Sequence, residues 1–489
     1  LVGGLAGDAL TGSADYSGGA NNVAIGRAAL GADTLGSSTV AIGFETLLAQ
    51  NFTSTTESHN TAVGHRAGLS VTTGVNNTLI GGLAGDALTD ADFNVAVGHQ
   101  TLTTDTLGSK STAIGQGALA NQNFTTATDS CNTAVGFSAA GNLTTGINNT
   151  LVGFEAGDKL TDADHNTAMG RRALYSNVLG SRSTAIGHNA LHNQNPATAV
   201  DMYNTAVGFE AGNLINTGVN NTFVGAQAGD ANTTANDNSA FGKSSLGANT
   251  TGTGNNAFGL NSLDANTTGN YNTAFGHVAL TTNITGGGNT AFGSQTLAST
   301  TGSSNTAVGD TAGYAVTSGS NNIFLGKEAG RTGSPGGNIT TASNTLVIGD
   351  ENISASHIQT DWTVASDQRD KTDFTALDVG LDFVNALKPV TYKWDKRSKY
   401  GDKTADDYDL DKITTDGTHK EDWLDIGFKA QEVEAIEKAA GYKIADKTNL
   451  TTSITGDGKQ YGIQYAKFVP ILVKAIQELT ARIKTLEDG

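Results

Sequence analysis

A serine and a lysine five positions apart, Ser366 and Lys371, are the residues whose types and spacing indicate chemistry. The serine hydroxyl can attack the carbonyl of Ala365 through a five-membered ring, which converts the amide into an ester that water hydrolyses. A neutral amine must accept the hydroxyl proton, and burial can lower the pKa of a lysine for that task. The pair therefore predicts self-cleavage of the Ala365–Ser366 bond, with Ser366 as nucleophile and Lys371 as general base.

The charged neighbours of this pair leave several roles open. Arg369 and nearby backbone N–H groups are both candidates to stabilise the oxyanion. Asp367 and Asp370 either orient the lysine or raise its pKa and oppose the reaction. A serine and a lysine at this spacing are more often ordinary surface residues, so the prediction depends on the motifs around them.

The chain has two different compositions on either side of this stretch. Residues 1–350 hold 10 Lys+Arg and 22 Asp+Glu, whereas residues 351–489 hold 19 and 25. All three tryptophans lie in the second part: Trp362, Trp394 and Trp423. The change predicts a repeat array over residues 1–350, a linker over 351–365 and a terminal domain over 366–489.

Charge and composition exclude several classes of function. The formal net charge of −18 argues against a nucleic-acid partner or an anionic membrane surface. The single cysteine, Cys131, permits no disulfide within the chain, and the histidines lack the spacing of metal ligands. We therefore predict no metal and no cofactor. No run of 18 apolar residues is present, so no membrane insertion is expected.

The first 350 residues repeat a short motif, Asn-Thr-Ala-Val-Gly, as at residues 60–64. From Gly26 to Gly208 its glycine recurs at steps of 17, with every fourth step lengthened to 21, which gives a superrepeat of 72 residues. A period this short is typical of a solenoid. The chain begins within such a repeat, so we expect a further part N-terminal to residue 1.

Each repeat contains a short alternating segment. Val23 and Ile25 fall on one face of the predicted strand, and Ala24 and Gly26 on the other, where small residues let a neighbouring backbone approach. A second short strand is expected at residues 29–30. Two short strands and two turns fit 17 residues.

Asparagine recurs four positions before each glycine, as at Asn60 and Asn77, and predicts a ladder of side-chain amides. Large apolar residues are scarce, so one stack buries little, and we expect three stacks to pack through their small faces as a homotrimer. The predicted fold class is an all-β repeat array followed by a small α+β domain. The array is either a parallel β-roll or β-solenoid, or an intertwined triple β-helix.

The terminal part contains four motifs after residue 371: a helix-like run at 381–387, an alternating run at 388–394, and the stretches 425–434 and 461–479. Its last residues form an apolar seam with steps of 4, 3, 4 and 3: Leu472, Ile476, Leu479, Ile483 and Leu486. This spacing predicts a coiled coil over residues 468–487, too short to be stable alone. The alternative is one amphipathic helix packed on its own domain.

These motifs, in this order, resemble the C-terminal intramolecular chaperone of phage tailspikes and fibres, the self-cleaving domain first described in endosialidases. The resemblance extends over residues 366–489. It implies that Ser366 and Lys371 are the cleaving pair, and that the domain trimerises, helps a fibre fold and is then released. The motif residues that support this assignment are Asp367, Arg369, Gly427, Phe428, Gln431 and Glu432. Two stretches, 396–422 and 441–459, lie where that family carries arms that grip the fibre.

The repeat array resembles the heads of trimeric autotransporter adhesins and the repeats of phage tail fibres. We therefore predict a trimeric phage tail fibre or spike that folds in the host cytoplasm and becomes part of the virion. Its partners would be a host cell-surface glycan or protein receptor and other tail components. A shift of 17 residues between two chains still aligns each repeat with an equivalent repeat. A chaperone domain that sets the register would prevent such a shift.

Two alternatives remain at this stage. One is a bacterial surface adhesin with a trimeric β-roll head. The other is a polysaccharide depolymerase whose catalytic part lies N-terminal to this chain. Any enzymatic activity of the chain itself is at most one self-cleavage event by a serine–lysine endopeptidase.

Overall fold

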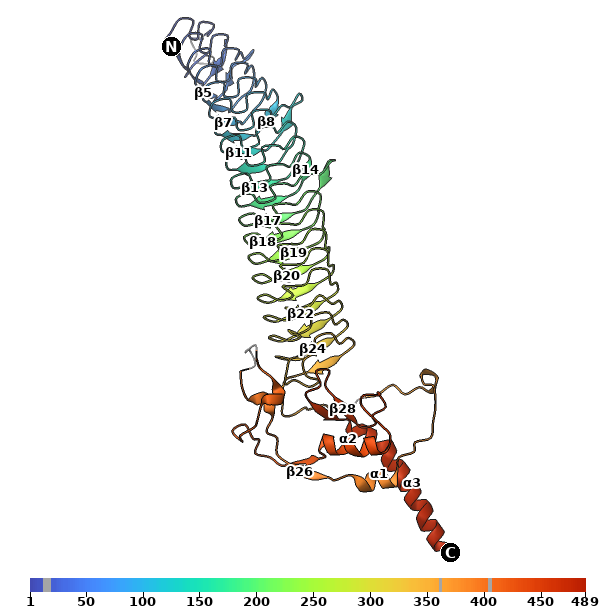
Figure 1. Cartoon of the computed structure of the whole chain (residues 1–489). Helices are drawn as coiled ribbons and strands as arrows, with labels where there is room; N and C mark the ends of the chain where they lie inside the picture. The colour runs from blue at the N-terminus through green and yellow to red at the C-terminus, as the bar shows by residue number, and fades with distance from the viewer. Residues whose placement is uncertain (12–18, 360–362, 403–406) are drawn as a thin grey trace. The chain divides into compact units, whose positions relative to one another are not determined.

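The computed structural model of this protein describes residues 1–11, 19–359, 363–402 and 407–489, so Trp362 of the predicted linker lies outside the described residues. The chain divides into two compact units, Leu1–Ala291 and Phe292–Gly489. The repeat array is a parallel β-solenoid, in which each coil contributes one strand of three residues (Figure 1). A small part with helices and short strands follows it. This architecture confirms the predicted fold class.

The three-residue strands of the first unit are β1 (Val23–Ile25), β3 (Val40–Ile42), β5 (Thr61–Val63), β6 (Thr78–Ile80), β7 (Val95–Val97), β9 (Thr112–Ile114), β11 (Thr133–Val135), β12 (Thr150–Val152), β13 (Thr167–Met169), β15 (Thr184–Ile186), β17 (Thr205–Val207), β18 (Thr222–Val224), β19 (Ser239–Phe241), β20 (Asn256–Phe258) and β21 (Thr273–Phe275). The strand β22 (Thr290–Phe292) spans the division between the units. The second unit continues with β23 (Thr306–Val308), β24 (Ile323–Leu325) and β25 (Leu346–Ile348). Neighbouring coils pair in parallel, so that Ala62 of β5 aligns with Leu79 of β6.

The middle residue of each strand points into the coil. Ala24 is fully buried, whereas Val23 and Ile25 on either side of it are 42% and 41% exposed. The small residues therefore fill the interior of each coil, because a 17-residue turn encloses little space. The prediction that three stacks pack through these small faces is wrong, since one chain already buries them.

The repeated glycine lets consecutive coils approach each other. A Cβ on Gly64 would lie 2.4 Å from the carbonyl oxygen of Gly81, and Gly64 has φ +138°. The same clash recurs in the next coils. The small residues thus allow the close approach of a neighbouring backbone, as predicted, and this backbone is the next coil of the same chain.

The predicted second strand at residues 29–30 is a turn. Ala28 and Leu30 have φ 57° and 55°, a left-handed conformation that no strand contains. The backbone still bonds from coil to coil, since the N–H of Leu30 donates to the carbonyl of Thr46 at 3.0 Å.

An exchange of side-chain volume inside the coil accounts for the alternation of leucine and glycine at one position of the superrepeat. Position 30 is a buried leucine, but Gly85 holds the equivalent position two coils beyond Leu47. A Cβ on Gly85 would lie 2.8 Å from Leu79 Cδ2 and 2.9 Å from Leu88 Cδ1. The glycine thus makes room for a leucine at the middle of the strand.

Each 21-residue coil pairs with the 17-residue coil before it through additional two-residue strands, one from each coil. These are β2 (Gly36–Ser37) with β4 (Thr56–Glu57), β8 (Gly108–Ser109) with β10 (Thr128–Asp129), and β14 (Gly180–Ser181) with β16 (Val200–Asp201). Buried polar groups fill the wider coil. Gln50 Nε2 donates to Asp33 Oδ2 at 2.8 Å, and the equivalent Gln122 donates to Asp105 at 2.6 Å.

The asparagine ladder is present, with a different bonding pattern from the predicted one. The side-chain oxygen of Asn60 accepts from the backbone N–H of Asn77 at 2.9 Å, and its Nδ2 donates to the carbonyl of Gly74 at 2.7 Å. Bonds between two side-chain amides are longer, as from Asn149 to Asn132 at 3.3 Å. Each asparagine therefore mainly satisfies backbone groups of its own and the next coil.

The remainder of the second unit contains α1 (Leu381–Ala386), α2 (Ala430–Ala439) and α3 (Phe468–Glu487), the antiparallel pairs β26 (Val390–Tyr392) with β27 (Asp425–Gly427) and β28 (Thr452–Ile454) with β29 (Tyr461–Ile463), and the 3-10 helices η1 (Gln368–Asp370), η2 (Arg397–Lys399), η3 (Leu410–Lys412) and η4 (Tyr465–Lys467). A small core joins the three α-helices through Phe383, Val433, Phe468 and Ile471. Residues 468–487, for which a coiled coil is predicted, form the helix α3, and its pairing with other copies stays a prediction.

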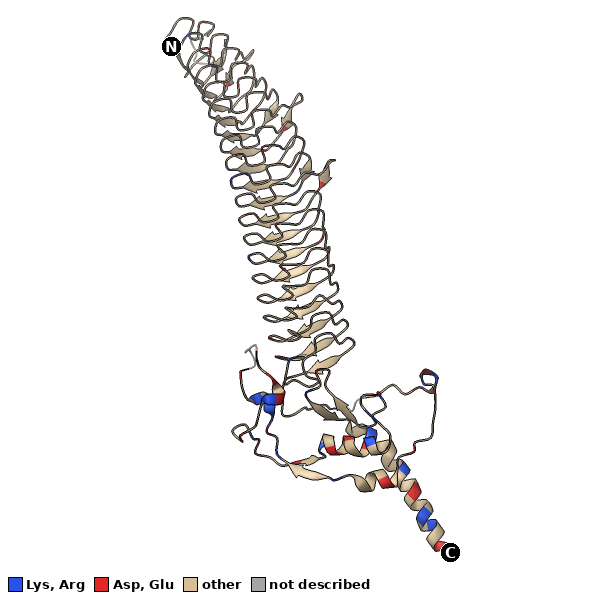
Figure 2. Ribbon diagram, in the orientation of Figure 1, with Lys and Arg blue, Asp and Glu red and all other residues tan. Residues whose placement is uncertain are grey.

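Charged residues are distributed unevenly between the solenoid and the part of the chain that follows it. Figure 2 shows them on the helices that follow the solenoid, whereas the coils carry few. Among the described residues, no helix has both the length and the apolarity needed to cross a membrane. The predicted domain boundaries near residues 350 and 366 remain predictions.

Candidate self-cleavage site

The predicted nucleophile and base lie on either side of η1, with Ser366 before the turn and Lys371 directly after it. Asp367 caps this turn, and its side chain accepts the backbone N–H of Arg369 at 2.9 Å. The turn brings Lys371 back toward Ser366. Lys371 Nζ donates to Ser366 Oγ and also lies 3.3 Å from the Ser366 carbonyl oxygen. A single short helical turn therefore brings the two predicted residues into contact.

Arg369 and Asp367 form a pair beside the candidate nucleophile. The guanidinium Nη2 lies 2.7 Å from Asp367 Oδ2, and Nε also donates to this carboxylate. The hydrogen bonds from Arg369 hold the pKa of the Asp367 carboxyl below its usual range. Asp367 thus caps the turn and binds Arg369, and both are exposed to solvent.

The whole segment around the pair is exposed in the single chain. Residues 363–376 all have exposed side chains. An amine acts as a general base only when it is neutral, and burial is the usual way in which proteins favour that form of lysine. The single chain therefore supplies the contact between Ser366 and Lys371 but not the burial.

The four other motif residues lie at the junction of β27 and α2. The ring of Phe428 stacks on Phe468 with centroids 5.4 Å apart, and its backbone N–H donates to Tyr465 Oη at 3.3 Å. A Cβ on Gly427 would lie 2.3 Å from the same Tyr465 oxygen. These contacts make Gly427 and Phe428 packing residues of the helical core.

Gln431 and Glu432 begin α2. Glu432 pairs with Lys429 at 2.8 Å, and Gln431 lines a groove of about 940 Å³ whose aromatic residues are Tyr392, Trp394, Trp423, Phe428, Tyr461 and Tyr465. In the described part of the chain, no hydrogen bond or ion pair joins Gly427, Phe428, Gln431 or Glu432 to the Ser366–Lys371 pair. The structure therefore brings together the nucleophile and the base, but not these supporting residues.

A buried carboxylate in α2 escaped the sequence analysis. Glu437 is fully buried and accepts from the backbone N–H of Thr451 at 2.6 Å and from Thr452 Oγ1 at 2.5 Å. Burial raises the pKa of Glu437, but the hydrogen bonds from Thr452 and Thr451 outweigh it and the net pKa lies below the usual range. Glu437 thus fixes the loop before β28 to α2. Its partners are 14 and 15 residues away, just before β28 and at its first residue, so no repeated spacing in the sequence predicts the contact.

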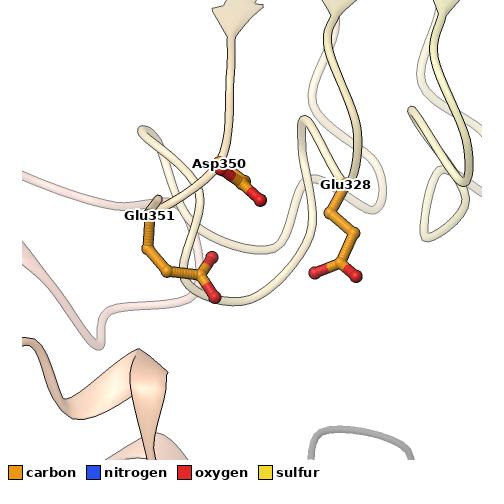
Figure 3. Close-up of side chains that lie close together, drawn as sticks. All are labelled: Glu328, Asp350 and Glu351. Atoms are coloured by element: carbon orange, nitrogen blue, oxygen red, sulfur yellow. The ribbon is translucent and has the colours of Figure 1, made fainter. Parts of the chain in front are cut away.

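Three carboxyl groups lie close together at the end of the solenoid. Figure 3 shows the side chains of Glu328, Asp350 and Glu351. One carboxylate oxygen of each lies within 4.8 Å of the others. Asp350 also accepts hydrogen bonds of 2.9 Å from the backbone and side chain of Asn352. Acidic groups at this spacing are common without a cation, and the spacing alone assigns no ligand.

Comparison with known families gives one match, in the terminal part of the chain. Residues 366–442 match the family described as chaperone of endosialidase. Over these residues the chain is similar to the endosialidase chaperones. The match begins at Ser366 and ends shortly after α2, so β28, β29 and α3 lie outside it although the resemblance was predicted to extend to residue 489. No curated protein and no solved structure matches this chain.

Proposed function

We propose that this protein is a trimeric tail fibre or spike of a phage, whose terminal domain drives trimerisation and folding and then releases itself. The endosialidase-chaperone match and the β-solenoid before it support this proposal. The fibre would bind a receptor on the host surface, a glycan or a protein, and would join other tail components through a part N-terminal to residue 1.

The observation that carries the self-cleavage proposal is the hydrogen bond between Lys371 and Ser366 at the first residue of the family match. Ser366 Oγ attacks the carbonyl carbon of Ala365, and its proton passes to the amine of Lys371. The carbon–nitrogen bond then breaks, the Ser366 nitrogen takes up a proton, and an ester joins Ala365 to the Ser366 oxygen. Water hydrolyses this ester to a carboxylate on Ala365 and restores the hydroxyl of Ser366.

Trimerisation is supported by apolar side chains that the single chain leaves exposed. All five residues of the predicted seam on α3 are exposed, and Ile476 is 63% exposed. An apolar seam of this spacing is typical of helices that pack against copies of themselves. The cleavage proposal requires that Lys371, which is exposed in the single chain, become buried when the copies associate.

The coils present a second apolar row that a trimer would cover. The third residue of each strand points outward, and the exposed members include Ile25, Ile80, Ile114, Met169, Ile186, Phe241, Phe292 and Val308. In part of this row the rings of Phe241, Phe258 and Phe275 stack with centroid separations of 4.7 and 4.3 Å. We propose this outward row, in place of the small faces, as the contact between stacks.

Intact-mass spectrometry of the full chain, folded under native conditions, tests the cleavage step. Wild type is expected to yield fragments 1–365 and 366–489, whereas Ser366→Ala and Lys371→Met remain at full length. Ser356→Ala removes an exposed hydroxyl of the linker and should cleave normally. A wild type that stays intact overturns the protease proposal and leaves the chaperone proposal standing.

Deletion of residues 366–489 tests the chaperone step. The truncated chain should give no soluble trimers, because its repeats lose the domain that brings three copies together. Native mass spectrometry and sedimentation report the oligomeric state. Soluble trimers from the truncated chain would contradict the proposal.

A further inference from the structure

The last coil of the solenoid departs from the repeat. Gly326 and Gly349 are 23 residues apart, six more than the usual 17. The backbone N–H of Thr317 donates to the carbonyl of Thr340 at 2.8 Å, which shows that the regular coil has resumed by residue 340. The extra residues therefore lie within residues 331–338, here named the insertion loop.

One segment of the terminal part packs against this coil. Gly333 lies so close to η2 that a Cβ on it would be 2.6 Å from Ser398 Cβ. Ser398 is only 2% exposed. Lys396 Nζ, just before η2, donates to the backbone carbonyl of Glu351 at 2.8 Å. This segment thus contacts both the insertion loop and the residues that leave the coil.

The turn between β28 and β29 makes the second contact. Asp457 Oδ2 accepts the backbone N–H of Asn338 at 3.2 Å, and a Cβ on Gly337 would lie 2.9 Å from Thr455 Cβ. The two contacting segments also bind each other, since Arg397 Nη2 donates to the carbonyl of Lys459 at 2.8 Å. They form one surface that faces the insertion loop.

A regular coil offers no feature that distinguishes the last coil from the others, because a slip of one repeat aligns equivalent residues. The insertion loop is such a feature, and it lies where the terminal part touches the coil. We propose that the insertion loop is a docking site for residues 396–398 and the β28–β29 turn, which hold the last coil closed and fix the coil onto which the rest of the solenoid winds. This inference rests on the proposed chaperone function.

Two lysines allow a matched test. Lys396 and Lys399 lie 3.7 and 3.8 Å from the same carboxylate oxygen of Glu421, but only Lys396 has a described bond to the coil. In full-length chains that carry Ser366→Ala, Lys396→Met should speed hydrogen–deuterium exchange of residues 330–349 by about tenfold, the effect of losing one hydrogen bond from a charged group. Lys399→Met should leave this exchange unchanged.

Two aspartates provide an independent pair. Asp457 caps the β28–β29 turn and also reaches Asn338, whereas Asp416 caps a turn by accepting from Thr418 at 2.7 and 2.9 Å. Asp457→Ala should lower the yield of soluble full-length protein and raise exchange in residues 330–349. Asp416→Ala removes a comparable turn cap and should do neither.

A chain that lacks residues 332–337 has a regular 17-residue last coil, and we expect it to fold poorly. The point variants keep the test decisive if that chain yields no protein. If Lys396→Met and Asp457→Ala match their controls in exchange and in yield, the docking inference is wrong even when deletion of residues 366–489 abolishes folding. If that deletion leaves folding intact, the chaperone proposal fails as a whole.

Discussion

The coils and the terminal part place their large apolar side chains differently. In the coils, Leu79, Leu151 and Phe223 are fully buried between neighbouring turns of the same chain. In the terminal part, Ile426 is 75% exposed, and the seam of α3 carries five exposed residues. The coils thus bury the leucines of their interior within one chain and expose apolar residues on their outer surface, whereas the seam of α3 is exposed along its whole length.

Polar groups show the same contrast. The coils bury asparagines whose side chains bond to backbone groups of adjacent turns, so each turn depends on the next. The terminal part carries ion pairs on its surface, such as Lys429 with Glu432. Coil stability therefore derives from neighbouring turns, and stability of the terminal part should depend on association.

The largest effect is expected at the repeated glycine. Gly153 has φ +139°, and a Cβ there would lie 2.5 Å from the carbonyl oxygen of Gly170. Gly153→Val should destabilise the solenoid by about 3 kcal/mol or more through backbone strain and overlap. Circular dichroism during thermal unfolding measures the loss. The control is Gly82→Ala, where the nearest atom to a new Cβ is 3.4 Å away; an equal loss in both variants would contradict the argument.

Truncating one apolar side chain in each region separates burial from association. Leu151→Ala should cost about 3 kcal/mol of coil stability, because the cavity is enclosed on all sides. Ile476→Ala should leave the coil signal unchanged and weaken trimer formation, which sedimentation measures. If Ile476→Ala leaves the oligomeric state unchanged while Leu151→Ala disrupts it, the assignment of Leu151 to the coil interior and of Ile476 to the contact between copies is wrong.

Removing one ladder amide should have an intermediate effect. Asn149 Oδ1 accepts the backbone N–H of Asn166 at 2.9 Å, and Asn149 Nδ2 donates to the carbonyl of Ala163 at 2.8 Å. Asn149→Ala leaves these buried groups without a partner and should cost about 2 kcal/mol in thermal unfolding. Asn216→Ala changes an exposed asparagine of the array and should be neutral. If Asn149→Ala leaves the thermal stability unchanged, water satisfies the backbone groups that the Asn149 side chain binds.

The sequence predicted the period, the asparagine ladder and the Ser366–Lys371 pair, because each depends on residues close together or strictly repeated. It did not predict which strand face points inward, since alternation alone assigns no direction. The volume enclosed by a 17-residue coil decides that Ala24 is inside. The bond of Glu437 to Thr451 and the contact of Asp457 with Asn338 join residues without a fixed spacing, so no local pattern reports them.

The buried carboxylate of Glu437 predicts an acid-sensitive terminal part. Its folded-state pKa is below the usual glutamate value of about 4.3, so its stabilisation is present above that value and is lost as the pH falls through the folded-state pKa. Glu437→Gln should cost about 1.5 kcal/mol at pH 7 and much less in acid. The three tryptophans all lie between residues 362 and 423, so their fluorescence reports this region alone. A cost that does not change with pH would contradict the role of the charge.

The smallest effect is expected for an ion pair on the outside of the coils. Arg172 Nε lies 2.6 Å from Glu155 Oε2, and both side chains remain partly exposed. Exposed pairs contribute little, so Glu155→Gln should change coil stability by about 0.5 kcal/mol or less, and by less again in high salt. A double-mutant cycle with Arg172→Met isolates the pair. A coupling as large as the Asn149 effect would mean that outward contacts also stabilise the turns, and the contrast between the two regions would then be one of degree.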